Sequence, residues 1–141
     1  MNKSLVVGAT GLVGSAVLEQ LAKRGERQIA VLRNVSDTLP ENIQIHQIDF
    51  DELLIRGDLP YCDHLYLCLG TTIKTAGSKE AFKRVEFDYC VGIAKLAVKA
   101  GASVVSLVSS VGANASSSNF YLLTKGEVEE AIRTLGFSTV N

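Results

Sequence analysis

The stretch "SLVVGATGLVGSAVLEQL", residues 4–21, joins a short apolar run, a glycine-rich turn and an amphipathic segment. The apolar run, residues 4–7, has the length and composition of a buried strand. Residues 12–24 then carry apolar side chains at helical spacing and stop before Gly25, where a helix would end. The sequence therefore predicts a strand that turns directly into a helix.

The same alternation continues along the chain. Further short, apolar, β-prone runs lie at residues 28–32, 43–48, 64–69 and 103–108, and residues 137–141 begin a sixth strand. Helices are predicted over Ser78–Ala100 and Asn119–Leu135, and a short helix or an irregular turn between residues 49 and 63. Alternating strands and helices with short connections predict an α/β fold: a doubly wound parallel sheet of the Rossmann type, in the strand order 3-2-1-4-5-6, with the sixth strand truncated.

The composition is that of one globular domain, which we place at residues 1–141. Hydrophobic residues make up 47% of the chain and charged residues 21%, which is typical of folded rather than disordered proteins. The net charge of −1 gives no indication of a nucleic-acid or anionic-membrane partner. Since no apolar run reaches about 18 residues, no transmembrane segment is predicted.

The cysteines and the N-terminus carry the prediction of cellular location. Cys62, Cys68 and Cys90 lie in apolar surroundings without a CxxC motif, so we interpret them as reduced, buried thiols rather than metal ligands or nucleophiles. The apolar run in "MNKSLVVGAT" is too short for a signal peptide. Together these features predict a cytoplasmic protein.

The glycine-rich turn has the pattern GxxGxxG, one residue wider at the front than GxGxxG. It follows a strand and opens a helix, which is the context in which such a turn binds a dinucleotide pyrophosphate at the helix N-terminus. The alternative is that the glycines serve only the tight turn. The predicted cofactor-binding residues of this turn are Gly8, Thr10, Gly11, Leu12, Val13 and Gly14.

The end of the second strand indicates which dinucleotide would bind. Arg33 lies there, and no acidic residue follows until Asp37. An acid at this place would bind ribose hydroxyls, whereas an arginine suits a 2′-phosphate, so NADP(H) is favoured over NAD. A solvated arginine at a strand end is the alternative. Asp49 and Phe50, after the third strand, could flank an adenine, although an ordinary loop explains them nearly as well.

The segment "NFYLLTKGEVEE", residues 119–130, places Tyr121 and Lys125 one helical turn apart. They share a stripe with three apolar residues, so Lys125 is on the inward side, where a charge is rarely left without a partner. A lysine stem that snorkels to solvent is the alternative. Ser109 and Ser110 end the fifth strand at the edge where this helix would begin. The apolar members of the stripe are Val128, Ile132 and Leu135.

The motifs "GATGLVGSAVLEQL", "LCLGTT", "VSSVGA" and "YLLTKGEVE", in this order, resemble the short-chain dehydrogenase/reductase superfamily. The resemblance is to its atypical NADPH-binding oxidoreductase branch, related to the HIV-Tat-interacting protein. It implies that Tyr121 is the general acid/base and that Lys125 holds the nicotinamide ribose and favours the phenolate. It also implies that Ser110, or its neighbour Ser109, binds the substrate oxygen. The same resemblance places the loop Leu69, Gly70 and Thr71 along the cofactor.

We therefore expect an NADP-dependent oxidoreductase that acts on a small carbonyl or alcohol. A non-catalytic NADP(H)-binding regulatory protein is the alternative. The sequence stops at Asn141, whereas members of the family continue, so we expect the C-terminal segment that shapes the substrate pocket to be absent. The identity of the substrate therefore cannot be predicted from these residues. The open sheet edge leaves a homo-oligomer as an option.

Overall fold

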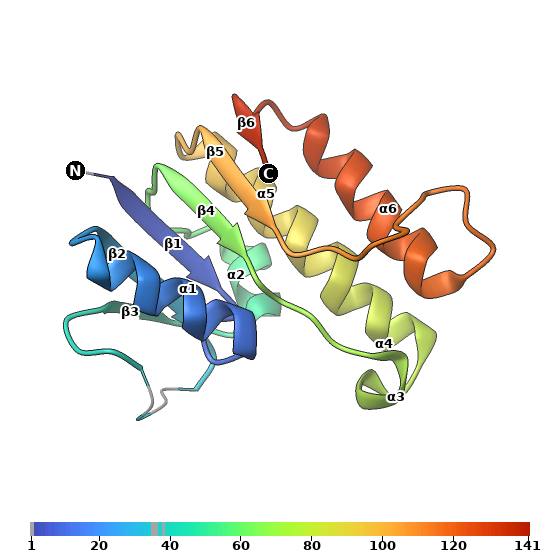
Figure 1. Cartoon of the computed structure of the whole chain (residues 1–141), viewed down its shortest axis with the longest axis horizontal. Helices are drawn as coiled ribbons and strands as arrows, with labels where there is room; N and C mark the ends of the chain where they lie inside the picture. The colour runs from blue at the N-terminus through green and yellow to red at the C-terminus, as the bar shows by residue number, and fades with distance from the viewer. Residues whose placement is uncertain (1, 35–36, 38) are drawn as a thin grey trace.

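The computed structural model describes residues 2–34, 37 and 39–141, and a parallel sheet runs through its centre (Figure 1). The sheet has six strands in the order β3-β2-β1-β4-β5-β6, and every neighbouring pair is parallel. This confirms the predicted doubly wound fold, including a short sixth strand. The strands are β1 (Lys3–Val7), β2 (Arg27–Leu32), β3 (Gln44–Gln47), β4 (His64–Leu67), β5 (Val104–Leu107) and β6 (Thr139–Val140).

Helices cover both faces of the sheet. The helix α1 (Leu12–Lys23) packs on one face, against side chains such as Val6 and Ala30. The helices α2 (Phe50–Arg56), α5 (Cys90–Lys99) and α6 (Phe120–Arg133) pack on the other. Alternate residues of each strand thus serve two cores, which explains why the strands are apolar on both sides. One row of neighbouring, fully buried residues crosses four strands: Ile29, Leu5, Leu65 and Val105.

Side-chain caps fix where several helices begin. The Asp49 carboxylate accepts hydrogen bonds from two backbone N–H groups of the first turn of α2, so the segment that sequence left open between helix and turn is a helix. Ser78, where the long helix was predicted to begin, accepts from Ala81 N at 3.0 Å and caps α4 (Lys79–Lys83). A further short helix, α3 (Ile73–Ala76), was not predicted; Thr72 caps it, and Gly77 ends it in the left-handed conformation.

The long helix predicted over Ser78–Ala100 is confirmed in its bounds, with Ser78 as N-cap and Ala100 as C-cap, but it is not a regular α-helix throughout. Between α4 and α5, residues Arg84–Tyr89 form a π-helical segment, η1, although the three segments follow one continuous path (Figure 1). A π segment widens the backbone turn and changes which side chains share a face. Periodicity of apolar residues at steps of three and four cannot detect this change, because the stripe remains apolar on either side of it.

The carboxyl ends of the strands and the start of α6 lie at the same edge of the sheet (Figure 1). The loops after β1, β2, β4 and β5 therefore meet there, as ligand-binding loops do in open α/β sheets. Within the described ranges, no helix is both long and apolar enough to cross a membrane.

Candidate functional site

The glycine-rich turn is tight, and two of its glycines are required by the space around them. Gly8 has a φ of +84°, and a Cβ there would lie 2.5 Å from the carbonyl oxygen of Cys68. A Cβ on Gly14 would overlap the carbonyl oxygen of Gly8. Gly11 precedes α1 and supplies no side-chain cap, so the first backbone N–H groups of a twelve-residue helix lack the usual side-chain partner. Such an end attracts an anion.

A cavity of about 380 Å³ lies against this turn at the carboxyl edge of the sheet. It brings together the glycine turn, the end of β2 and the loop after β4, three segments far apart in sequence. The predicted cofactor residues Gly8, Thr10, Arg33, Phe50 and Leu69 line it. Its other lining residues are Ala9, Val31, Leu32, Asn34, Val85 and Tyr89. The remaining predicted residues of the turn, Gly11, Leu12, Val13 and Gly14, stand beside the cavity rather than in its wall.

Aromatic rings form one wall of the cavity. The rings of Phe50 and Tyr89 have centroids 5.4 Å apart and are tilted by 49°. The Tyr89 hydroxyl accepts a hydrogen bond from Arg84 Nε at 3.3 Å, and Arg84 also pairs with Asp51 at 2.5 Å. Tyr89, which lies within the helix predicted over Ser78–Ala100, was not among the predicted site residues. Asp49, predicted beside the adenine, uses its carboxylate to cap α2.

Arg33 is exposed at the mouth of the cavity. Its backbone carbonyl accepts a hydrogen bond from the Gln47 side chain at 3.3 Å, which ties the end of β2 to β3. Its guanidinium forms no ion pair within the part of the chain that the structure describes. The side chain is thus available to an anionic group entering the cavity, and its role as a 2′-phosphate ligand stays a prediction.

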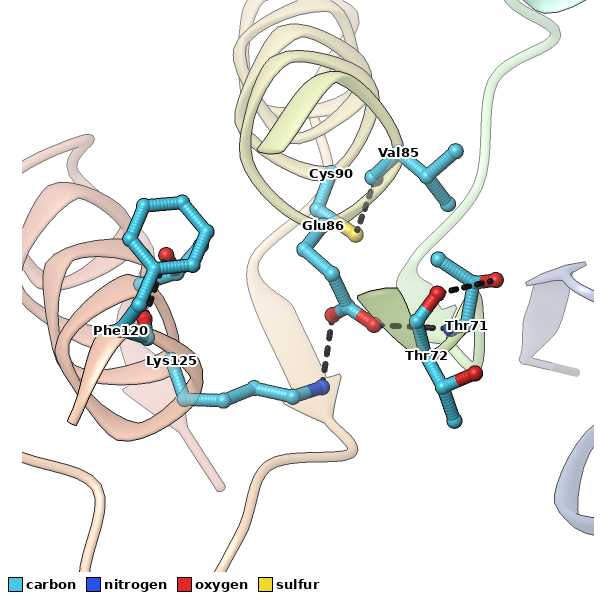
Figure 2. Close-up of polar contacts among 8 residues, drawn as sticks. Thr71, Thr72, Val85, Glu86, Cys90, Phe120 and Lys125 are labelled. Atoms are coloured by element: carbon cyan, nitrogen blue, oxygen red, sulfur yellow. Dashed lines mark hydrogen bonds and ion pairs between the residues drawn. The ribbon is translucent and has the colours of Figure 1, made fainter. Parts of the chain in front are cut away.

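Lys125 is buried on the inward side of α6, as its place on the stripe predicts. Its ammonium donates to the Glu86 carboxylate across 2.6 Å, and only 6% of the lysine side chain and 2% of the glutamate side chain are exposed. The second Glu86 oxygen accepts from the backbone N–H of Thr71 at 2.9 Å (Figure 2). The lysine therefore does not snorkel to solvent; its charge is neutralised inside the protein.

Glu86 was missed by sequence reasoning. The inward place of Lys125 signalled that a buried partner must exist, but 39 residues separate the two side chains. Thr71, predicted to lie along the cofactor, is attached to Glu86, and its loop partners Leu69 and Gly70 connect it to the end of β4. Leu69 reaches the cavity wall, whereas Gly70 and Thr71 do not.

Tyr121 lies on the same face of α6 as Lys125, with the lysine Nζ 5.7 Å from its ring centroid. Its ring also packs against Phe82 of α4, at 5.5 Å between centroids. The two candidate serines differ in their surroundings. Ser110 Oγ donates to the carbonyl of Val111 at 3.3 Å, whereas Ser109 Oγ is buried without a partner among the described residues. The catalytic roles of Tyr121, Lys125 and either serine stay predictions.

The three cysteines are free; Cys62 and Cys90 are buried, as predicted, whereas Cys68 is only partly buried. Burial raises the pKa of Cys62 and of Cys90 to about 12 and that of Cys68 to about 11. A thiol with so high a pKa carries almost no thiolate near neutral pH and is a poor nucleophile. Among the described residues, no group of histidine, cysteine and acidic side chains could hold a metal ion.

Curated proteins similar to this chain come from fungi and a mammal. "Protein FMP52, mitochondrial" of Candida albicans is 34% identical over 145 residues, covering 95% of this chain and 62% of the relative. The protein of the same name in Lodderomyces elongisporus is 37% identical, covering 96% and 62%. "Protein HTATIP2" of Rattus norvegicus is 34% identical, covering 99% and 60%. The chain thus spans about three fifths of the length of the curated relatives it matches.

Solved structures with a similar fold include sugar-nucleotide enzymes. The UDP-glucose 4-epimerase of Thermotoga maritima, with UDP-glucose, matches with a TM-score of 0.77 at 16% identity, covering 98% of this chain and 54% of that one. The enzyme WbmG of Bordetella bronchiseptica, in complex with NAD, matches with a TM-score of 0.79 at 14% identity, covering 98% and 51%. At these identities the likeness establishes the fold alone.

The names of the fungal relatives contradict the predicted cytoplasmic location, and that prediction is wrong. Free, buried cysteines do not distinguish among the compartments that keep thiols reduced. The family itself is clear, because a family model described as NAD(P)H-binding matches residues 8–137. With the Rossmann sheet, the glycine turn and the relatives above, the chain belongs to the NAD(P)H-binding family, within the atypical group of proteins like short-chain dehydrogenases/reductases.

Proposed function

We propose that the chain forms the cofactor-binding part of an NADP-dependent oxidoreductase that acts on a small carbonyl or alcohol. The observation that carries the proposal is the joint placement of two groups at one sheet edge. The cavity against the glycine turn lies there, and so does α6 with Tyr121 beside the buried Lys125. A helix that only packs on the sheet would not need a buried lysine such as Lys125, paired with a buried carboxylate such as that of Glu86.

The lining of the cavity supports the binding of a dinucleotide at its adenosine end. The turn at Gly8 and Gly14 would present the α1 N-terminus to a pyrophosphate, and a Cβ at either glycine would collide with backbone atoms and shift that turn. Phe50 and Tyr89 would flank the adenine, and Arg33 at the mouth would bind the 2′-phosphate that distinguishes NADP from NAD. When bound, the nicotinamide supplies or accepts the hydride.

The residues of α6 and of the loop after β5 would handle the proton and the substrate oxygen. Tyr121 would exchange a proton with the substrate oxygen as general acid/base. The positive charge of Lys125, close to the tyrosine ring, would stabilise the phenolate. Ser110, or Ser109 with its unpartnered buried hydroxyl, would hydrogen-bond that same oxygen.

Replacement of Tyr121 by phenylalanine tests the catalytic part of the proposal. NADPH oxidation would be followed with a panel of small aldehydes and ketones, on this chain and on a C-terminally extended form. Tyr121→Phe should abolish turnover and leave NADPH affinity unchanged, because only the hydroxyl is lost. Turnover that survives Tyr121→Phe would refute the assignment. NADPH binding without turnover in either form would favour the regulatory alternative.

A further inference from the structure

Glu86 connects three elements at the carboxyl edge of the sheet. It belongs to η1 on the long helix, pairs with Lys125 on α6, and holds the backbone of Thr71 in the loop after β4 (Figure 2). The carboxylate uses one oxygen for each partner, at 2.6 and 2.9 Å. Lys125 is 39 residues from Glu86 in the sequence, and Thr71 is 15 residues away. One side chain therefore holds together three segments that are distant in sequence.

The π-helical segment presents two neighbouring faces to two parts of the site. Val85 and Tyr89 line the cavity against the glycine turn. Glu86 faces α6, where it contacts Lys125, and Phe82 of the preceding helix α4 contacts Tyr121 on the same side. Glu86 therefore stands between the cavity and the helix that carries the catalytic candidates, and π segments often occur at such functional places.

The hydrogen-bonding capacity of Lys125 points to a ligand. An ammonium has three donors, and the Glu86 carboxylate takes one of them. Within the described ranges, the other two have no hydrogen-bond acceptor, although the residue is only 5% exposed. Buried donors are normally satisfied, so a polar ligand that supplies acceptors would complete the group.

We propose that Glu86 is a positioning residue of the dinucleotide site, whose carboxylate holds the Lys125 ammonium and the Thr71 backbone together so that the free ammonium donors meet the ribose beside the nicotinamide. The inference rests on the proposed function. Without the carboxylate, a long lysine side chain would sample several rotamers, and the loop after β4 would lose its attachment. Glu86 is not among the residues that line the cavity, so it would act through Lys125 and Thr71.

The test compares two ligands that share only the adenosine end. NADPH and adenosine 2′,5′-bisphosphate would be titrated into the wild type, Glu86→Gln, Lys125→Met and the double variant; the bisphosphate lacks the second ribose. Glu86→Gln should weaken NADPH about tenfold, equivalent to about 1.4 kcal/mol, and change the bisphosphate by less than about twofold. In the Lys125→Met background, Glu86→Gln should add no further loss. Glu80→Gln, the same change at an exposed position on α4, is the control and should alter neither affinity.

Thermal melting of each variant establishes that it is folded, because Glu86→Gln leaves a buried ammonium without its counter-ion. Glu86→Asp is the second variant: it keeps the charge but withdraws the carboxylate by one methylene, and it should also weaken NADPH while sparing the bisphosphate. Equal effects on both ligands, or no effect on NADPH, would overturn the role of Glu86 and leave the dinucleotide proposal standing. A wild-type chain that binds neither ligand would overturn both.

Discussion

Replacement of Lys125 by methionine should destabilise the protein strongly. The substitution keeps an unbranched apolar stem but removes the terminal ammonium, so the Glu86 carboxylate, 2% exposed, loses its counter-ion. Breaking a buried ion pair by removing one partner costs about 3–5 kcal/mol. Because a domain of this kind has about 5–15 kcal/mol of stability in total, the loss would be a large fraction of it.

The measurement is urea unfolding of four proteins: the wild type, Lys125→Met, Glu86→Met and the double variant. The double variant should recover at least about 2 kcal/mol relative to the sum of the single losses, because an apolar pair can replace a buried ion pair at little cost. Arg56→Met is the matched control. It breaks an exposed pair with Glu52 at 3.2 Å and should cost about 0.5 kcal/mol or less. A Lys125→Met loss as small as that of the control would refute the buried pair.

Two further predictions concern the glycine turn and the thiols. Gly14→Ala should reduce thermal stability and abolish NADPH binding in a titration, because the added Cβ meets the carbonyl of Gly8; an alanine variant that binds normally would contradict the close approach. Burial raises the pKa of Cys90 from about 9 to about 12, so between these pH values the folded state binds more protons than the unfolded state. The free energy of unfolding should therefore fall as the pH rises from about 9 toward 12. Cys90→Ala should flatten that decline in urea unfolding, and an unchanged slope would argue against the buried thiol.

The fold could be predicted because its signals are local. Apolar runs such as residues 28–32, glycines at helix ends and caps such as Ser78 each act within a few residues, and the parallel order follows from their alternation. The irregular features could not be predicted in this way. The π segment at Arg84–Tyr89 keeps the apolar stripe intact on both sides, so nothing in the spacing reveals it.

The site was predictable in part for the same reason. Arg33 and Gly8 reach the cavity because the ends of parallel strands must meet at one edge. Glu86 and Tyr89 were missed, since their roles depend on how the long helix is rotated against α6 and the cavity. Asp49 has a local role that its acidic character did not reveal: one oxygen of its carboxylate caps α2, and its place beside the adenine stays a prediction.

The most direct test of the account is a titration of NADPH and NADH into the wild type and Arg33→Ala. We predict tighter binding of NADPH, and loss of about 10- to 100-fold of its affinity in Arg33→Ala with little change for NADH, since charge-assisted hydrogen bonds of about 1.5–3 kcal/mol are removed. Arg27→Ala, at the opposite end of β2, should leave both affinities unchanged. Equal affinities for the two dinucleotides in the wild type, or binding of neither, would contradict the account.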